Sequence, residues 1–142
     1  MADARDKIAA EFELLDRTLA ALGEAMSRPD KAMTEWMAIA GFVHNFYNGV
    51  ENILKLALRE VGRQTPSDSP TYHRDLIDLA KAAGVISGPL SEKLDEYRAF
   101  RHFFVHAYGI FLDPAQLEPL ADGVRPVYLE FRREIEGSTH RR

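Results

Sequence analysis

The chain has 142 residues, no cysteine and a formal net charge of −4 at pH 7. This length predicts a single domain over residues 1–142 that can bury a core, and the lack of cysteine excludes disulfides and thiolate zinc sites. The acidic balance argues against a generally basic, nucleic-acid-coating surface but leaves room for a local basic pocket. No apolar run is long enough to span a bilayer, and residues 1–7 lack the apolar core of a signal peptide, so we expect a cytoplasmic protein that does not enter membranes.

The first half of the chain has the hydrophobic spacing of helices. Apolar residues at three- and four-residue steps predict a first helix from Ile8 to Met26, which the proline-containing stretch 27–30 ends. A second helix is expected from about Lys31 to Val61. Gly49 inside it costs about 1 kcal/mol of helix propensity. This glycine either allows a close helix contact or is simply tolerated.

The second half continues in the same way after a polar loop at residues 62–69. A third, short helix is expected to follow Ser69-Pro70 and to end at Gly84. A fourth begins near Gly88-Pro89 or Ser91 and ends at Asp113-Pro114. Because proline lacks a backbone donor and clashes with the preceding turn, Pro119 and Pro126 are expected to divide the last segment into a short turn and a helix over residues 127–136.

These elements together predict an all-α fold. There is no strand-like alternation, so we expect an antiparallel bundle of four to five helices with short connections. The last residues, 136–142, are expected to form a disordered tail, and the arginines near that end are either a solvated cluster or a phosphate-binding one.

The most informative segment is residues 101–108, in the predicted fourth helix. It places Arg101, His102, His106 and Tyr108 within eight residues. A guanidinium can hold a phosphate, imidazoles can move protons at neutral pH, and a phenol offers a hydroxyl for modification. The three residues between the histidines, Phe103, Phe104 and Val105, are expected in the core.

Helix geometry limits how these side chains can act together. At about 100° per residue, Arg101 and Tyr108 share one face, whereas His102 and His106 share another. Arg101 and His106 differ in direction by roughly 140° and in height by about 7.5 Å, so a straight helix does not aim both at one phosphate. Pairing two such helices across a dimer axis would form a composite site, and we favour that arrangement.

The chemistry that these groups support is metal-independent cleavage of RNA. A histidine can take a proton from a ribose 2′-hydroxyl or return one to a leaving oxygen, and an arginine can stabilise the charge that builds on the phosphate. An arginine and a histidine at this spacing are, however, also common by chance in helices. His102 and His106 have the spacing of two metal ligands, but Phe103 stands where the metalloprotease pattern needs glutamate, so neither a metal nor a cofactor is expected.

A polar stripe on the predicted second helix is a further candidate, formed by His44, Asn48, Glu51 and Lys55 at steps of four, three and four. It is either a solvated or internally paired face, or the wall of a cleft that orients Arg101 or His106. Two other histidines are not assigned to a site: His73 is expected to make a local cap or loop contact, and His140 to lie in a solvated tail.

Taken together, these residues resemble the HEPN superfamily and, within it, the HepT-like ribonuclease toxins. The signature of that family is arginine, four residues, histidine, one residue and tyrosine, here Arg101, His106 and Tyr108. The resemblance covers roughly residues 36–114. It is carried by the segments Phe42–Ile53, Tyr72–Ile77, Leu94–His102 and Tyr108–Asp113.

The resemblance implies a helical homodimer that pairs through the motif helix and acts as an endoribonuclease, the toxin of a type II/VII-like toxin–antitoxin pair. Its implied partner is an MNT-type nucleotidyltransferase antitoxin, which would transfer AMP from ATP to Tyr108 and silence the toxin. Two alternatives remain: a catalytically inactive HEPN partner or substrate-binding subunit of a nucleotidyltransferase, and a structural all-α dimer. The sequence leaves open which RNA is cut and whether His102 or His106 is the main proton carrier.

Overall fold

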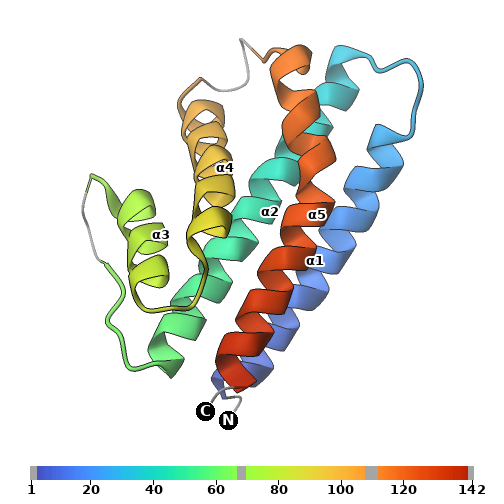
Figure 1. The fold of residues 1–142 in the computed structure, drawn as a ribbon. Coiled ribbons are helices and arrows are strands. Elements are labelled where there is room, and N and C mark those ends of the chain that lie inside the picture. Colours follow the sequence, from blue (N-terminus) through green and yellow to red (C-terminus); the bar gives the residue numbers. More distant parts are fainter. Residues whose placement is uncertain (1–2, 67–69, 108–111, 141–142) are drawn as a thin grey trace.

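The computed structural model describes residues 3–66, 70–107 and 112–140, and these form five α-helices. The helices are α1 (Ala4–Met26), α2 (Met33–Glu60), α3 (Tyr72–Ala82), α4 (Gly88–Ala107) and α5 (Pro114–His140). No strand occurs within these ranges, which confirms the prediction of an all-α fold (Figure 1). Of the predicted continuation of α4 to Asp113-Pro114, residues 108–111 lie outside the described residues, and Leu112 and Asp113 are not helical.

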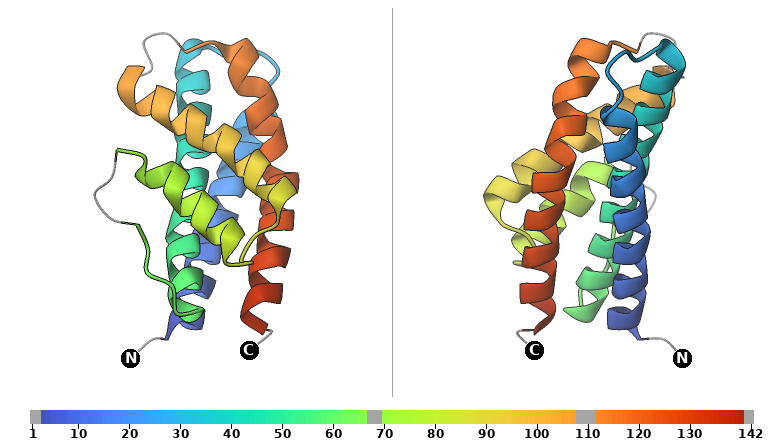
Figure 2. Two further views of the ribbon diagram at one scale, coloured as in Figure 1. Left: turned by 60° about the vertical axis from the view of Figure 1, so that its left-hand side comes forward. Right: turned by 90° about the vertical axis from the view of Figure 1, so that its right-hand side faces the viewer.

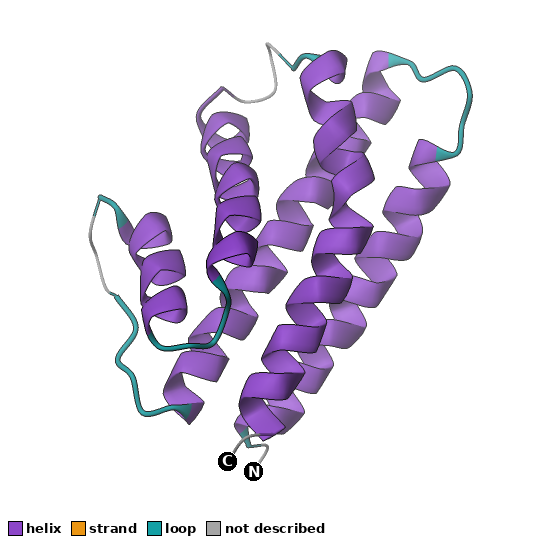
Figure 3. Ribbon diagram, viewed as in Figure 1, coloured by secondary structure: helices purple, strands orange, loops and turns teal. Residues whose placement is uncertain are grey.

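The helix α2 is the centre of the bundle because it packs against all four of the others. The long helices α1 and α5 lie beside it, while the shorter α3 and α4 are inclined across it, as the two views of Figure 2 show. In chain order α1 and α2 run antiparallel, as do α4 and α5, so the predicted antiparallel packing holds for these pairs (Figures 1 and 3).

The α1–α2 contact depends on a glycine. At Gly49 a Cβ atom would lie 2.5 Å from Cδ2 of Leu15, a side chain that is itself buried in the core. The glycine therefore lets the backbone of α2 approach α1 closely, which is the first of the two explanations suggested by the sequence. The N-terminus of α1 is capped by Asp3, whose side chain accepts a hydrogen bond from the amide of Asp6 at 2.9 Å.

The prediction for α5 was wrong, because the helix runs without a break through Pro119 and Pro126. Both prolines lie on the exposed side of α5, as do residues 115 and 122, whose carbonyls lose their amide partners. Water can satisfy those carbonyls. Burial of the opposite face then stabilises the helix by more than the two prolines destabilise it, at about 3 kcal/mol for each proline. That face is formed by Leu117, Ala121, Val124, Val127, Tyr128, Phe131 and Ile135.

The helix α5 also continues past residue 136 to His140, through residues for which a disordered tail was expected. Within the described part of the chain, no helix combines the length and apolar character needed to cross a bilayer.

Candidate active site on α2, α3 and α4

The helix α4 carries Arg101 and is fixed over the polar stripe of α2 by aromatic packing. Phe100 is buried and its ring stacks on Phe104 with centroids 5.8 Å apart, and Phe104 in turn lies 5.3 Å from the ring of His44 on α2. Arg101, which follows Phe100 and lies about one turn before Phe104, is half-buried. Its Nε atom donates a hydrogen bond to Oδ1 of Asn48, also on α2, at 3.4 Å.

Asn48 links Arg101 to His44. Since its Oδ1 accepts from Arg101, its Nδ2 is the atom that donates to His44 Nε2, 3.1 Å away. An accepting Nε2 requires the neutral imidazole. Burial, reinforced by the charge of Arg101 and opposed by Glu51, lowers the pKa of His44, which agrees with that protonation state. Three residues that the sequence singled out are thus joined in one chain of hydrogen bonds.

One turn further along α2, Glu51 is a buried carboxylate whose partner is a histidine. Nδ1 of His73, on α3, lies 2.7 Å from Oε2 and 2.9 Å from Oε1 of Glu51. The histidine ring meets that of Tyr72 edge-on at 5.0 Å, and the Lys55 ammonium lies 5.3 Å above Tyr72. The sequence missed this pair because the two residues lie 22 positions apart and no spacing rule joins them.

Two further groups border the stripe. The hydroxyl of Tyr47 is fully buried and has no hydrogen-bond partner among the described residues. Burial and the neighbouring charge of Glu51 raise the pKa of Tyr47, so the phenol stays protonated. Arg98, one turn before Arg101, donates from Nε to Asp95, which raises the pKa of Arg98 and lowers that of Asp95. Arg98 is therefore committed to a carboxylate, whereas no ion pair of Arg101 is found among the described residues.

The motif histidines lie elsewhere on α4. His102 and His106 are both exposed, and their ring centroids are 4.4 Å apart. Among the described residues, no hydrogen bond or ring contact joins either of them to Arg101. Tyr108, the expected modification site, lies outside the described residues. No group of three or more acidic or histidine side chains is placed to hold a metal ion in the described part of the chain.

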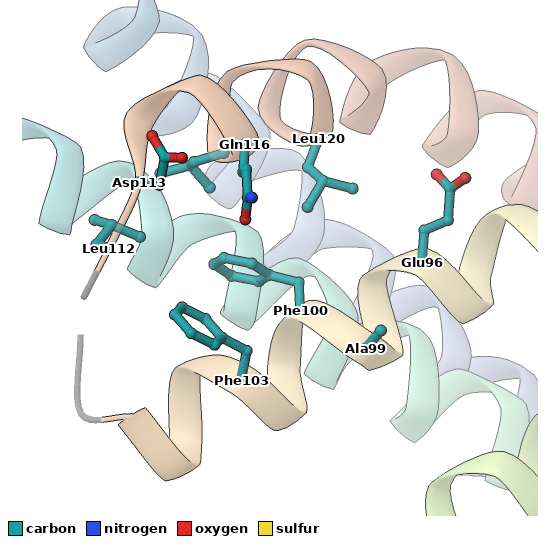
Figure 4. A pocket seen from close by; sticks show the side chains of 9 residues that line it. Glu96, Ala99, Phe100, Phe103, Leu112, Asp113, Gln116 and Leu120 are labelled. Carbon is teal, nitrogen blue, oxygen red and sulfur yellow. The ribbon is translucent and has the colours of Figure 1, made fainter. Parts of the chain in front are cut away.

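A separate apolar cavity of about 300 Å³ lies between α4 and the start of α5 (Figure 4). Phe100, Phe103 and Leu112 line it, with Glu96 and Asp113 at its borders. The expectation that residues 103–105 are all core was wrong in part: Phe103 is 41% and Val105 39% exposed. The reason is that α4 meets its neighbours through Phe100 and Phe104, which leaves residues 103 and 105 on other faces of the helix.

In the described residues the chain is a five-helix bundle whose fourth helix carries Arg101 and His106, an architecture that fits the HEPN class of helical proteins. The comparison with family models agrees, since the model of the HepT-like protein family matches residues 38–140. The chain therefore belongs to the HepT-like family, which confirms the resemblance found in the sequence. Neither the curated proteins nor the solved structures gave a match.

Proposed function

We propose that this protein is a metal-independent endoribonuclease and the toxin of a toxin–antitoxin pair. The observation that carries the proposal is the Arg101–Asn48 contact, which holds the motif arginine on the polar stripe of α2 instead of leaving it on a free surface. Membership of the HepT-like family, which suggests a HEPN ribonuclease toxin, supports the same conclusion. RNA is the substrate class because the reaction needs a ribose 2′-hydroxyl.

In the proposed reaction Arg101 binds the scissile phosphate and stabilises the charge of the transition state. His106, with His102 beside it, transfers the protons. Since these histidines are exposed and no hydrogen bond or ring contact joins them to Arg101 among the described residues of one chain, we infer that the site is completed by a second copy in a homodimer. The exposed Phe103 and Val105 on the same helix offer apolar surface for such pairing.

The proposed off-switch is AMP transfer to Tyr108 by an MNT-type nucleotidyltransferase antitoxin. In the sequence Tyr108 stands seven residues after Arg101, a spacing that predicts one shared face if both belong to one helix. An AMP group there adds bulk and negative charge where an RNA phosphate would bind next to Arg101, so modification and substrate binding exclude one another.

The test is expression and cleavage with matched variants. The wild type, expressed without its partner, should slow growth and cut RNA in the presence of EDTA, whereas Arg101→Ala and His106→Ala should do neither. Equal activity in these variants would refute the catalytic assignment. Absence of cleavage by the wild type, with AMP still added by the partner, would support the inactive-partner alternative instead.

The modification is tested by intact mass after incubation with the nucleotidyltransferase and ATP. We expect the mass of one AMP to be added to the wild type and nothing to be added to Tyr108→Phe. If Tyr108→Phe still gains that mass, another residue is the acceptor.

A further inference from the structure

We propose that His73, oriented by the buried carboxylate of Glu51, is a further catalytic residue, the base that takes the proton from the ribose 2′-hydroxyl. The inference rests on the proposed ribonuclease function. It assigns a proton carrier that belongs to the same chain as Arg101. The other candidate carrier, His106, is not positioned beside Arg101 within one chain.

The first support is the geometry of the pair. A carboxylate only accepts hydrogen bonds, so the Nδ1 atom of His73, 2.7 Å from Glu51, carries a hydrogen. In the neutral ring that a base requires, the lone pair is then on the opposite nitrogen, Nε2, for which no hydrogen bond to a described residue is found. The His73 side chain is 34% exposed while that of Glu51 is only 6% exposed, so the carboxylate is buried beneath a ring that solvent, and hence a substrate, can reach. A carboxylate that fixes the tautomer of a histidine base is a recurring catalytic arrangement.

The second support is the position of the pair relative to Arg101. Arg101 contacts α2 at Asn48 and His73 contacts α2 at Glu51. These two contact points are three residues apart, about 4.5 Å along one helix face. The charges of Arg101 and Glu51 both act on His44, and both also act on Tyr47, as expected for groups gathered in one site. A phosphate held by Arg101 would therefore have the His73 imidazole beside it.

A purely structural role explains the pair less well. Burying a carboxyl group costs more than packing an apolar residue of the same size, unless its hydrogen bonds recover the difference. His73, the hydrogen-bond partner of Glu51, is also partly open to solvent, so it does not fully separate the carboxylate from water. Tyr72, set edge-on against His73 with the Lys55 ammonium above it, further restricts the ring orientation. Such restriction serves a base that must point in one direction.

The proposed step balances as follows. Nε2 of His73 removes the proton of the 2′-hydroxyl, and the 2′-oxygen forms a bond to phosphorus. The bond between phosphorus and the 5′-oxygen breaks, and that oxygen takes a proton from the imidazolium of His106 of the second copy in the proposed homodimer. The products are a 2′,3′-cyclic phosphate and a 5′-hydroxyl, and the proton held by His73 passes to solvent in exchange for the one that His106 regains.

The experiment is chemical rescue in the full-length protein. RNA cleavage is measured for the wild type, His73→Ala, Arg101→Ala and Arg74→Ala, each with and without added imidazole. We expect His73→Ala to lose at least about 100-fold in rate, within the usual range for a general base, and to regain at least about tenfold with imidazole. Arg101→Ala should stay inactive with imidazole, and Arg74→Ala, an exposed neighbour of His73 on α3, should match the wild type.

Unfolding in urea and the cyclic-phosphate end of the product are measured alongside. If His73→Ala does not fold, His73→Gln is used, because its amide can still donate to Glu51 but cannot act as a base. Low activity in the folded Gln variant supports the proposal. Wild-type rates in either variant, or a loss in His73→Ala that imidazole does not restore, would overturn this role for His73 and leave the ribonuclease assignment intact. No cleavage by the wild type would overturn both.

Discussion

The close approach at Gly49 makes a quantitative prediction when it is compared with a second glycine of the same helix. At Gly41 an added Cβ would have no neighbour within 4 Å, whereas at Gly49 it would meet Leu15 Cδ2 at 2.5 Å, Cγ at 3.0 Å and Cδ1 at 3.3 Å. Both substitutions to alanine gain about 1 kcal/mol of helix propensity. Only Gly49→Ala must also displace a side chain that is 2% exposed and enclosed by the core.

The magnitude follows from these two effects. Overpacking a well-filled core costs about 1–3 kcal/mol. Gly41→Ala should therefore raise the free energy of unfolding by up to about 1 kcal/mol, and Gly49→Ala should lie about 1–3 kcal/mol below it. Urea denaturation followed by circular dichroism, with all proteins at one concentration, measures both values, and the slope with denaturant should not change. If Gly49→Ala is as stable as Gly41→Ala, then the inference that α1 and α2 pack too closely at Gly49 for a larger side chain is refuted.

Two further predictions concern the site and the core. Asn48→Ala removes the acceptor for Arg101 and should lower the kcat/KM for RNA about tenfold. This is the lower end of the effect of a hydrogen bond to a charged group, since the bond is 3.4 Å long. Asn45→Ala, at an exposed position of the same helix, is the control, and an equal loss there would refute the link between Asn48 and Arg101. Burial and a hydrogen bond to Asp16 raise the pKa of Tyr128 from 10.0 to about 12. A raised pKa stabilises the fold below the unfolded value and loses that contribution as pH rises, so the stability advantage of the wild type over Tyr128→Phe should shrink between about pH 10 and 12. Urea denaturation across that range measures it, and an advantage that is constant with pH would contradict this reasoning.

The sequence predicted the first four helices well because their buried faces repeat at helical spacing and polar or proline-containing stretches separate them. It failed on the last helix because a rule for isolated helices was applied to Pro119 and Pro126. Whether a missing backbone donor matters depends on which face the proline occupies, and only the packed bundle decides that. Water can satisfy the exposed carbonyls, and the buried face continues undisturbed on the other side.

The site was predictable only in part. The polar stripe could be seen as a spacing on one helix, and the motif as a spacing on another, because each lies within a single element. The contact between Asn48 and Arg101 joins the two elements, and the contact between Glu51 and His73 adds a third. Contacts of this kind depend on how the helices cross. His73, for which the sequence predicted a local cap or loop contact, therefore proves to be the partner of Glu51, the one buried acidic residue in the described part of the chain.

The central position of α2 has a consequence for how this protein tolerates change. The same helix supplies much of the core on one side and the stripe that holds Arg101 and His73 on the other. Few of its positions are thus free to vary, and a rotation of α2 by a fraction of a turn would disturb packing and chemistry together. Under the proposed toxin function, selection for a more stable core and selection for a weaker toxin would act on the same segment of the chain, so variants that escape toxicity by mutation in α2 should often be poorly folded ones.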